Sequence, residues 1–399
     1  MQYSKLTIYI AFVGAAVLPL TAMAGAKLKI DDDSSIDLGF RVQAMYLNND
    51  EDFRSNTDEF RLRRARIRLK GDITKWVTAF LQTEAASDDG GTGEDMRLID
   101  AWAMVKPYEL LNITGGQHMA ATTRQNLTSS GGLLAMDRPG INNYILTWGN
   151  SGRAAFNTGS LPGTRSGLSG DSNVRDRGAS LFGKTSFNDT THFKYYLGVF
   201  EGSNTRQGDP ERFAGRVQVN FFDPEPGYFQ VATYLGKKKT VGIGLGFDQQ
   251  SSVAVDSVTG EDVDYSLWAI DGFAEWPVGR GSLNLEGAYN NLDFSGPGNA
   301  LADSPGGSIL GAPARQVEGD GYYLQAGYYI NKWQPWFLYE NWDSDGTGGD
   351  GDWDAWRIGL SYFIKGHNAA IKLGYESVNN KTSGLPGADT FAVGIYTTY

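Results

Sequence analysis

A dense row of basic residues lies between Phe60 and Lys70, where five arginines and one lysine occur within eleven residues. From residue 64 onward the row alternates with Ala65, Ile67 and Leu69, and its members are Arg64, Arg66, Arg68 and Lys70. Alternate residues of a β-strand point to opposite faces, so one face is cationic and the other apolar. Neighbouring charges about 6.7 Å apart repel by about 0.6 kcal/mol in water and about 2.5 kcal/mol at an effective dielectric of 20. The basic side chains are therefore tolerated only where they remain hydrated, and there they can attract anions.

Two kinds of strand satisfy this pattern. One is a solvated strand of a soluble sheet. The other is one wall of an aqueous pore, whose apolar face meets lipid. On the lipid side an Arg or Lys costs roughly 2 to 4 kcal/mol near the midplane, so the basic face of such a wall must line the pore.

A second group of arginines lies in an aperiodic stretch, between a strand that ends near Met119 and one that starts near Arg175. Within residues 120–173 the acidic residues are Asp137 and Asp171. A structureless loop of that length is either functional or disordered. We expect residues 120–174 to fold into the lumen as a constriction loop, where two basic surfaces would concentrate anions; the candidate pore-lining residues here are Arg124, Arg138, Arg153, Arg175 and Arg177. The alternative is an external flap without contact to the pore.

The elements that must position these residues are short alternating segments, which follow one another from Ser34 to the end of the chain. The stretches that separate these segments are alternately short and long, and the long ones are rich in Gly, Asp and Ser. This is typical of an outer-membrane barrel, and a sandwich has no reason to sort its loops in this way. Seventeen segments can be counted, but bacterial single-chain barrels have even strand numbers. The weakest segment runs from Asp223 to Lys239, which we interpret as a long periplasmic connection. The prediction is an all-β protein, a 16-stranded antiparallel transmembrane β-barrel with an inward-folded constriction loop; eighteen strands is the alternative count.

Tryptophans lie near the expected strand ends. Trp76, Trp276 and Trp333 are beside short breaks, and Trp342 and Trp353 flank a long one. Amphipathic rings at both ends of the strands would form the two aromatic belts of a membrane interface.

The first residues of the chain indicate a secretory signal peptide. Lys5 precedes an apolar run over residues 6–20, and Ala22-Met23-Ala24 predicts cleavage before Gly25. Residues 1–24 are therefore expected to be removed, and residues 25–399 to form one barrel domain. No later apolar run reaches the roughly 20 residues of a membrane helix. The sequence has no cysteine and a net charge of −11, which argues against disulfides, thiolate metal sites and nucleic-acid binding.

Residues that suggest catalysis or a bound metal are sparse. His118, His192 and His367 are far apart in sequence, and no nucleophile motif is present. The acidic stretch 343–354 matches the start of a calcium-binding loop but loses its register at the later ligands. We therefore expect no enzyme activity, no metal site and no cofactor.

Several stretches resemble one known family, the phosphate-selective porins O and P. These stretches are RRARIRLKGDI, DAWAMVKPYELLNITGGQHMA, LTSSGGLLAMDRP, RDRGASLFGK and YLGKKKTVGIGLGFD. The resemblance implies a 16-stranded barrel, a homotrimer, a third loop folded into the lumen and an arginine ladder that guides anions. By position, Arg64, Arg66 and Arg68 correspond to the inward strand arginines of the family. His118, Met119 and Ala120 depart from its pattern, which predicts a weaker and broader anion preference.

The resulting hypothesis is a passive channel in the outer membrane of a Gram-negative bacterium. It would admit small hydrophilic solutes, preferentially anions such as phosphate, and its partners would be outer-membrane lipid and small anions. The alternative is a structural barrel sheath for a porin–cytochrome electron-transfer complex, in which other chains would supply the haem.

Overall fold

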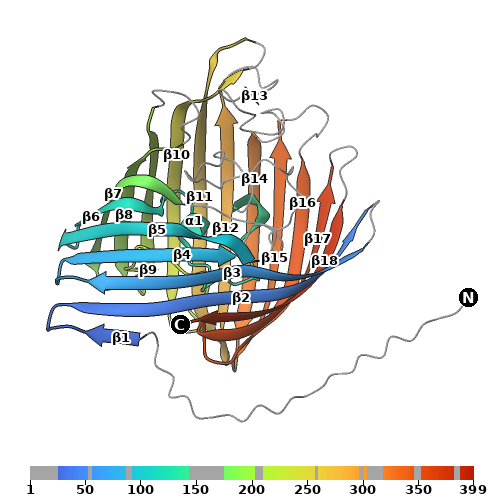
Figure 1. Ribbon diagram of the computed structural model, residues 1–399. Helices are drawn as coiled ribbons and strands as arrows, with labels where there is room; N and C mark the ends of the chain where they lie inside the picture. Colours follow the sequence, from blue (N-terminus) through green and yellow to red (C-terminus); the bar gives the residue numbers. More distant parts are fainter. Residues whose placement is uncertain are drawn as a thin grey trace, which may run out of the picture.

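The computed structural model describes residues 26–52, 56–86, 92–142, 175–202, 210–256, 259–295, 301–302, 318–345, 352–381 and 387–399. In these parts of the chain the sheet contains eighteen strands, of which β1 (Ala26–Lys29) and β13 (Leu301–Ala302) are short. The other sixteen form a closed antiparallel barrel (Figure 1), which confirms the predicted fold and strand number.

The sixteen strands of the wall follow one another around the ring in chain order. They are β2 (Ser35–Glu51), β3 (Thr57–Asp72), β4 (Val77–Ala86), β5 (Thr92–Tyr108), β6 (Leu111–Met119), β7 (Arg175–Asn188), β8 (Thr191–Phe200), β9 (Arg212–Phe222), β10 (Thr240–Asp256), β11 (Asp262–Val278), β12 (Gly281–Phe294), β14 (Gly319–Tyr329), β15 (Trp333–Ser344), β16 (Trp353–Phe363), β17 (Ala369–Asn380) and β18 (Ala388–Thr398). The ring closes where β18 pairs with β2, with Thr390 opposite Asn49.

The connections differ in length at the two ends of the barrel. Six of those at the end that holds the start of β2 and the end of β18 are short, and they span residues 73–76, 109–110, 189–190, 279–280, 330–332 and 364–368. The exception is residues 223–239. Because Phe222 pairs directly with Thr240, β9 and β10 are neighbours and this segment is a connection, as predicted, not a crossing.

Side chains alternate between the two faces of the wall, and β11 shows this clearly. Leu267, Ala269 and Asp271 are buried on the inner face, whereas Trp268 and Ile270 are exposed on the outer face. An apolar outer face is what a wall in contact with hydrocarbon requires. Among the described residues, no helix has the length and apolar character needed to cross a membrane.

A β-bulge interrupts this alternation where the basic row begins. The register between β2 and β3 shifts after Gln43, where Gln43 opposes Arg64 and Ala44 opposes Leu62. A bulge adds one residue to one strand and redirects its side chain. As a result Arg63 and Arg64, although adjacent in sequence, are both buried on the inner side.

The tryptophans form one of the two expected belts. Trp76 and Trp333 are exposed beside short turns, and Trp276 lies at the same end with 36% of its surface exposed. Trp342 and Trp353 instead lie opposite each other on β15 and β16 and are fully buried. Their assignment to the second belt was wrong, because the strand alternation turns both rings inward.

Two segments occupy the interior of the barrel. Residues 120–142, which include the short helix α1 (Arg124–Leu127), lie within the ring of strands (Figure 1). Residues 223–239 enter from the short-turn end and pair with them: the Gln230 N–H donates to the Leu127 carbonyl oxygen at 3.0 Å, and the Ala232 N–H donates to that of Gly132 at 2.8 Å. The interior is therefore packed against two connections, one from each end.

The packing also ties residues 120–142 to distant strands. The Lys372 ammonium on β17 donates to the carbonyl oxygens of Leu133, Leu134 and Ala135 at 2.7, 3.2 and 2.8 Å. The Tyr396 hydroxyl on β18 donates to the Met136 carbonyl oxygen at 2.9 Å. These bonds satisfy buried main-chain groups that a loop without regular structure would otherwise leave unpaired.

Candidate functional site

The basic row on β3 faces the lumen, as its alternation predicts, but its members have different partners. Arg66 pairs with the buried Glu84 on β4. Arg68 donates to the main-chain oxygen of Tyr399 at 2.7 Å. Lys70 lies partly exposed and pairs with Asp72 at 2.9 Å. The row is therefore partly neutralised at its buried end and more accessible toward the short-turn end.

Arg64 belongs to a clamp around Asp137 of the inner segment. The Asp137 carboxylate accepts from Arg63 at 2.6 Å and from Arg64 at 2.9 Å, and all three side chains are buried. Burial alone opposes ionisation, but the two guanidinium groups outweigh it and hold the pKa of Asp137 well below its usual range. The clamp fixes residues 120–142 against β3, so Arg64 acts as an anchor of that segment.

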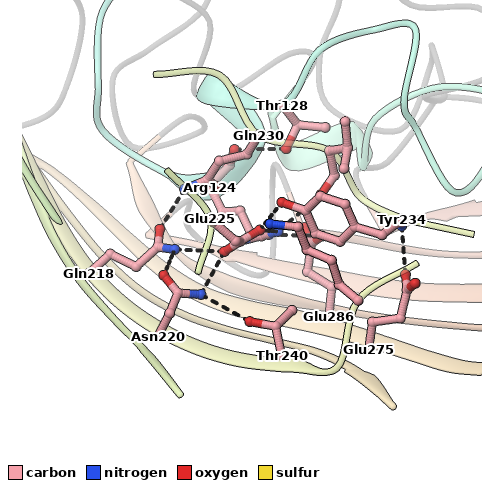
Figure 2. A network of polar contacts seen from close by, with 12 residues as sticks. Arg124, Thr128, Gln218, Asn220, Glu225, Gln230, Tyr234, Thr240, Glu275 and Glu286 are labelled. Carbon is pink, nitrogen blue, oxygen red and sulfur yellow. Dashed lines mark hydrogen bonds and ion pairs between the residues drawn. The ribbon is translucent and has the colours of Figure 1, made fainter. Parts of the chain in front are cut away.

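Arg124, the first residue of α1, is held in the interior by the carboxylates of Glu225 and Glu286 (Figure 2). It makes a bidentate pair with Glu225, at 2.9 and 2.7 Å, and lies 3.4 Å from Glu286 on β12. Its guanidinium also stacks 3.8 Å above the ring centre of Phe273. Despite burial, the nearby Arg124 holds the pKa of Glu225 well below its usual range. Arg124 therefore joins the two inner segments and offers no free charge to a solute, which differs from the predicted pore-lining position.

The other predicted arginines have varied positions. Arg138 is buried and donates to the carbonyl oxygens of Gln125 at 3.0 Å and Thr128 at 2.5 Å. Arg175 is buried at the start of β7. Its Nε donates at 2.9 Å to a carboxylate of β5, that of Asp100. Arg153 lies outside the described residues.

Arg177 lies on the outer face of β7, with 54% of its side chain exposed, and pairs with Glu201 at 2.7 Å. The inward positions of this strand belong to the buried Asp176 and Ser180. Arg177 therefore departs from the predicted pore-lining position, because strand alternation turns it outward.

A cavity of about 520 Å³ lies on the β2 to β7 side of the interior, and we call it the basic cavity. Its described lining contains six basic side chains, namely Arg41, Arg68, Lys70, Lys106, Arg175 and Lys184, and one carboxylate, that of Asp100. Residues from both inner segments complete it, including Ser129, Ser130 and Tyr228. The excess of positive charge gives this cavity a positive potential.

The motif reading missed three basic members of the cavity, Lys106, Lys184 and Arg41, of which Arg41 is the most deeply buried. Its guanidinium donates to three hydroxyl groups, those of Ser129, Ser130 and Thr398. Among the described residues no carboxylate pairs with it, so its charge is not neutralised locally. Alternation could have revealed it, because Phe40 and Val42 on either side are exposed and place Arg41 on the inner face.

The opposite side of the interior has a different charge pattern. There, buried arginines pair with buried carboxylates: Arg212 with Asp248, Arg216 with Asp271, and Arg357 with Glu340 and Glu376. These pairs cancel within the wall, whereas Arg41, Arg68 and Lys106 in the basic cavity donate to hydroxyl or main-chain oxygens.

The described residues contain no group of three or more His, Cys, Asp or Glu side chains placed to hold a metal ion. Of the acidic stretch 343–354, residues 346–351 lie outside the described part. Within the barrel wall, His118 donates through Nδ1 to the Gly116 carbonyl oxygen at 2.9 Å, and its Nε2 is hydrogen-bonded to the Ser180 hydroxyl at 2.7 Å.

Comparisons with solved structures identify several chains with the same fold. An anion-selective porin from Comamonas acidovorans is 14% identical, with a TM-score of 0.58, and the match covers 92% of this chain and 100% of that one. Salmonella typhi OmpF in complex with daunomycin is 14% identical, with a TM-score of 0.56 over 94% of this chain and 100% of that one. The trimer form of OmpT, an outer membrane protein of Vibrio cholerae, is also 14% identical, with a TM-score of 0.53 over 92% and 100%.

No curated protein matches the sequence. The family model described as phosphate-selective porin O and P matches residues 36–395, which is nearly all of the chain. The closed 16-stranded antiparallel wall agrees with this match. The chain therefore belongs to the phosphate-selective porin O and P family, and it is a porin of the Gram-negative outer membrane.

Proposed function

We propose that this porin passes small hydrophilic solutes with a preference for anions, such as phosphate, and that the anions move through the basic cavity. The observation that carries the proposal is the lining of that cavity, where six basic side chains accompany one carboxylate. A surface of one sign around a narrow aqueous space raises the local concentration of the opposite ion. The solute is moved and not chemically changed.

Several separated cations suit transport better than one deep site. Conduction requires sites strong enough to admit an ion and weak enough to release it. Arg41 comes from β2, Lys106 from β5 and Lys184 from β7, so the charges are distributed along the wall. This distribution supports a broad anion preference over tight binding of a single phosphate.

The interior packing disfavours the alternative of a sheath around a cytochrome complex. In the described part of the chain, residues 120–142 and 223–239 fill the interior and hydrogen-bond to each other. A second polypeptide would have to displace both segments and break the buried pair between Arg124 and Glu225.

Arg41→Ala tests the anion pathway, because Arg41 has hydroxyl partners and its loss leaves no carboxylate unpaired. A unit charge about 7 Å from an ion contributes about 0.6 kcal/mol in water, which is roughly a threefold change in anion occupancy. The chloride-to-potassium permeability ratio in planar bilayers should therefore fall by at least about that factor. The matched control is Arg177→Ala on the outer face. An unchanged ratio in Arg41→Ala, or an equal fall in both variants, would reject the pathway.

We also infer that the barrels assemble as a homotrimer within outer-membrane lipid. The Vibrio cholerae OmpT structure is described as a trimer form and shares this fold. The mass of the purified protein, measured by sedimentation with the detergent contribution subtracted, should equal three chains. A mass of one chain would contradict the inference.

A further inference from the structure

The basic cavity also contains a group of aromatic side chains. Its lining includes five rings, Phe80, Trp102, Phe182, Tyr228 and Phe229. Phe80, Trp102 and Phe182 belong to the wall, and Tyr228 and Phe229 belong to residues 223–239. A passage for inorganic ions needs charge and water, and these rings supply neither. They therefore point to a solute with an apolar part as well as a negative charge.

The strand register places a cation and two of the rings side by side. Lys70 lies opposite Phe80 across β3 and β4, and Phe80 lies opposite Trp102 across β4 and β5. Neighbouring strands are about 4.8 Å apart, so the row advances from charge to ring to ring in steps of that size. The ring centres of Phe80 and Trp102 are 5.3 Å apart. Arg68, two residues from Lys70 on the same face, extends the cationic end of the row.

Two buried hydrogen-bond donors in this lining have no partner among the described residues. They are Nε of Arg68 and the indole Nε1 of Trp102. A buried donor without an acceptor costs free energy, and an anionic oxygen bound in the cavity would supply the missing acceptor. Both donors suit an anionic oxygen.

From these observations we propose that the basic cavity accepts aryl carboxylates, small organic anions whose ring lies against Phe80 and Trp102 while the carboxylate lies toward Arg68 and Lys70. The proposal rests on the proposed anion pathway and names a class of solute for it. A volume of about 520 Å³ is ample for a benzoate-sized ion. Aromatic pairs add a preference beyond the burial of area, and we expect it to favour an aryl acid over its saturated analogue by about three- to tenfold.

The experiment compares benzoate with cyclohexanecarboxylate, which has the same charge and a similar size but no aromatic ring. Each is added to single channels of the full protein in planar bilayers that carry chloride current, and the concentration that halves the current is measured. Benzoate should reach half block at a concentration about three- to tenfold lower. Trp102→Leu should reduce this ratio toward one, and Trp102→Phe, which keeps a ring but removes the indole N–H, should retain part of it. Trp356→Leu, on the outer face, is the matched control.

The outcomes separate this inference from the proposed function. Equal block by the two acids in the unmodified protein would overturn the aromatic inference, whether or not the variants fold. A preference for benzoate that Trp102→Leu leaves intact would overturn the assignment to this row. The zero-current potential of the unmodified protein in a potassium chloride gradient tests the anion pathway separately, and a cation-selective sign would overturn both.

Discussion

Replacing Glu225 by Gln should release the contact that joins the two inner segments. In Glu225 one carboxylate oxygen accepts from Arg124 and Tyr234, and the other accepts from Arg124, Gln218 and Asn220. All of these partners are donors (Figure 2). A glutamine amide has one donor group, so in one orientation its NH₂ would face three donors, and in the other it would face the Arg124 guanidinium and the Tyr234 hydroxyl, which can turn to accept.

The size of the effect follows from the burial of this pair. Arg124 has no exposed surface and Glu225 has 4%. Removal of one partner from a buried ion pair costs about 3 to 5 kcal/mol, because the remaining charge stays desolvated. Glu286 lies 3.4 Å from Arg124 and offsets part of that cost. We therefore expect a loss of about 3 kcal/mol in the free energy of unfolding.

The assay is the denaturant midpoint of the refolded protein in detergent, together with single-channel conductance. Glu225→Gln should lower the midpoint, and it should increase conductance or current noise because residues 223–239 are less firmly held in the interior. Glu261→Gln, whose side chain is exposed at the opposite end, is the matched control and should change neither quantity. If the Glu225→Gln protein had the same denaturant midpoint, conductance and current noise as this control, the idea that the Arg124 pair fixes the two segments would be refuted.

Two further predictions concern the fit of the inner segments and their response to acid. A Cβ at Gly246 would lie 1.8 Å from the Thr122 carbonyl oxygen, so Gly246→Ala should cost about 1 to 3 kcal/mol of stability in a denaturant titration. The control is Gly272→Ala, whose Cβ would meet no atom within 4 Å and which should cost little. Equal stabilities of the two variants would contradict the prediction. His367 in the turn between β16 and β17 donates through Nε2 to the Thr233 carbonyl oxygen at 2.9 Å, and burial lowers its pKa from 6.5 to about 4. Between these values the unfolded chain binds a proton that the folded chain does not, so stability should fall by up to about 1.4 kcal/mol per pH unit as the pH decreases from 6.5 toward 4. His367→Gln should show a flatter pH dependence, and parallel curves for the two proteins would refute the assignment.

The fold could be predicted because its rules are local. Alternation alone orients Arg66, Arg68 and Ile67 correctly, since the period of a strand leaves two faces to choose from. The requirement for an even number of strands identified residues 223–239 as a connection. A barrel with both chain termini at the same end cannot contain a seventeenth crossing. These predictions required no knowledge of distant contacts.

The charge state of the candidate site depends on partners far apart in the chain. Arg124 and Glu225 are 101 residues apart, and Arg63 and Asp137 are 74 apart. No local pattern indicates such pairs, so Arg124 looked like a free cation. The bulge that turns Arg63 inward had a local signal, two adjacent arginines that break the alternation. The sequence could also have placed Arg177 on the outer face, because alternation along its strand puts Asp176 and Ser180 on the inner face.

The distribution of charge in the interior suggests how structure and selectivity are combined. Arginines such as Arg212 and Arg357 lie between two carboxylates each and hold the wall together. Arg41 instead lies among hydroxyls at the basic cavity. The same residue type therefore stabilises one side of the barrel and sets the potential on the other.

The most direct test of the account is the zero-current potential of the unmodified protein in a planar bilayer between two concentrations of potassium chloride. The basic cavity predicts that chloride crosses more readily than potassium, so the dilute side should become negative. Because charge screening weakens with dilution, the preference should increase as both concentrations are lowered at a fixed ratio. A potential of the opposite sign, or one that shows no preference at low salt, would contradict the claim that this cavity carries anions.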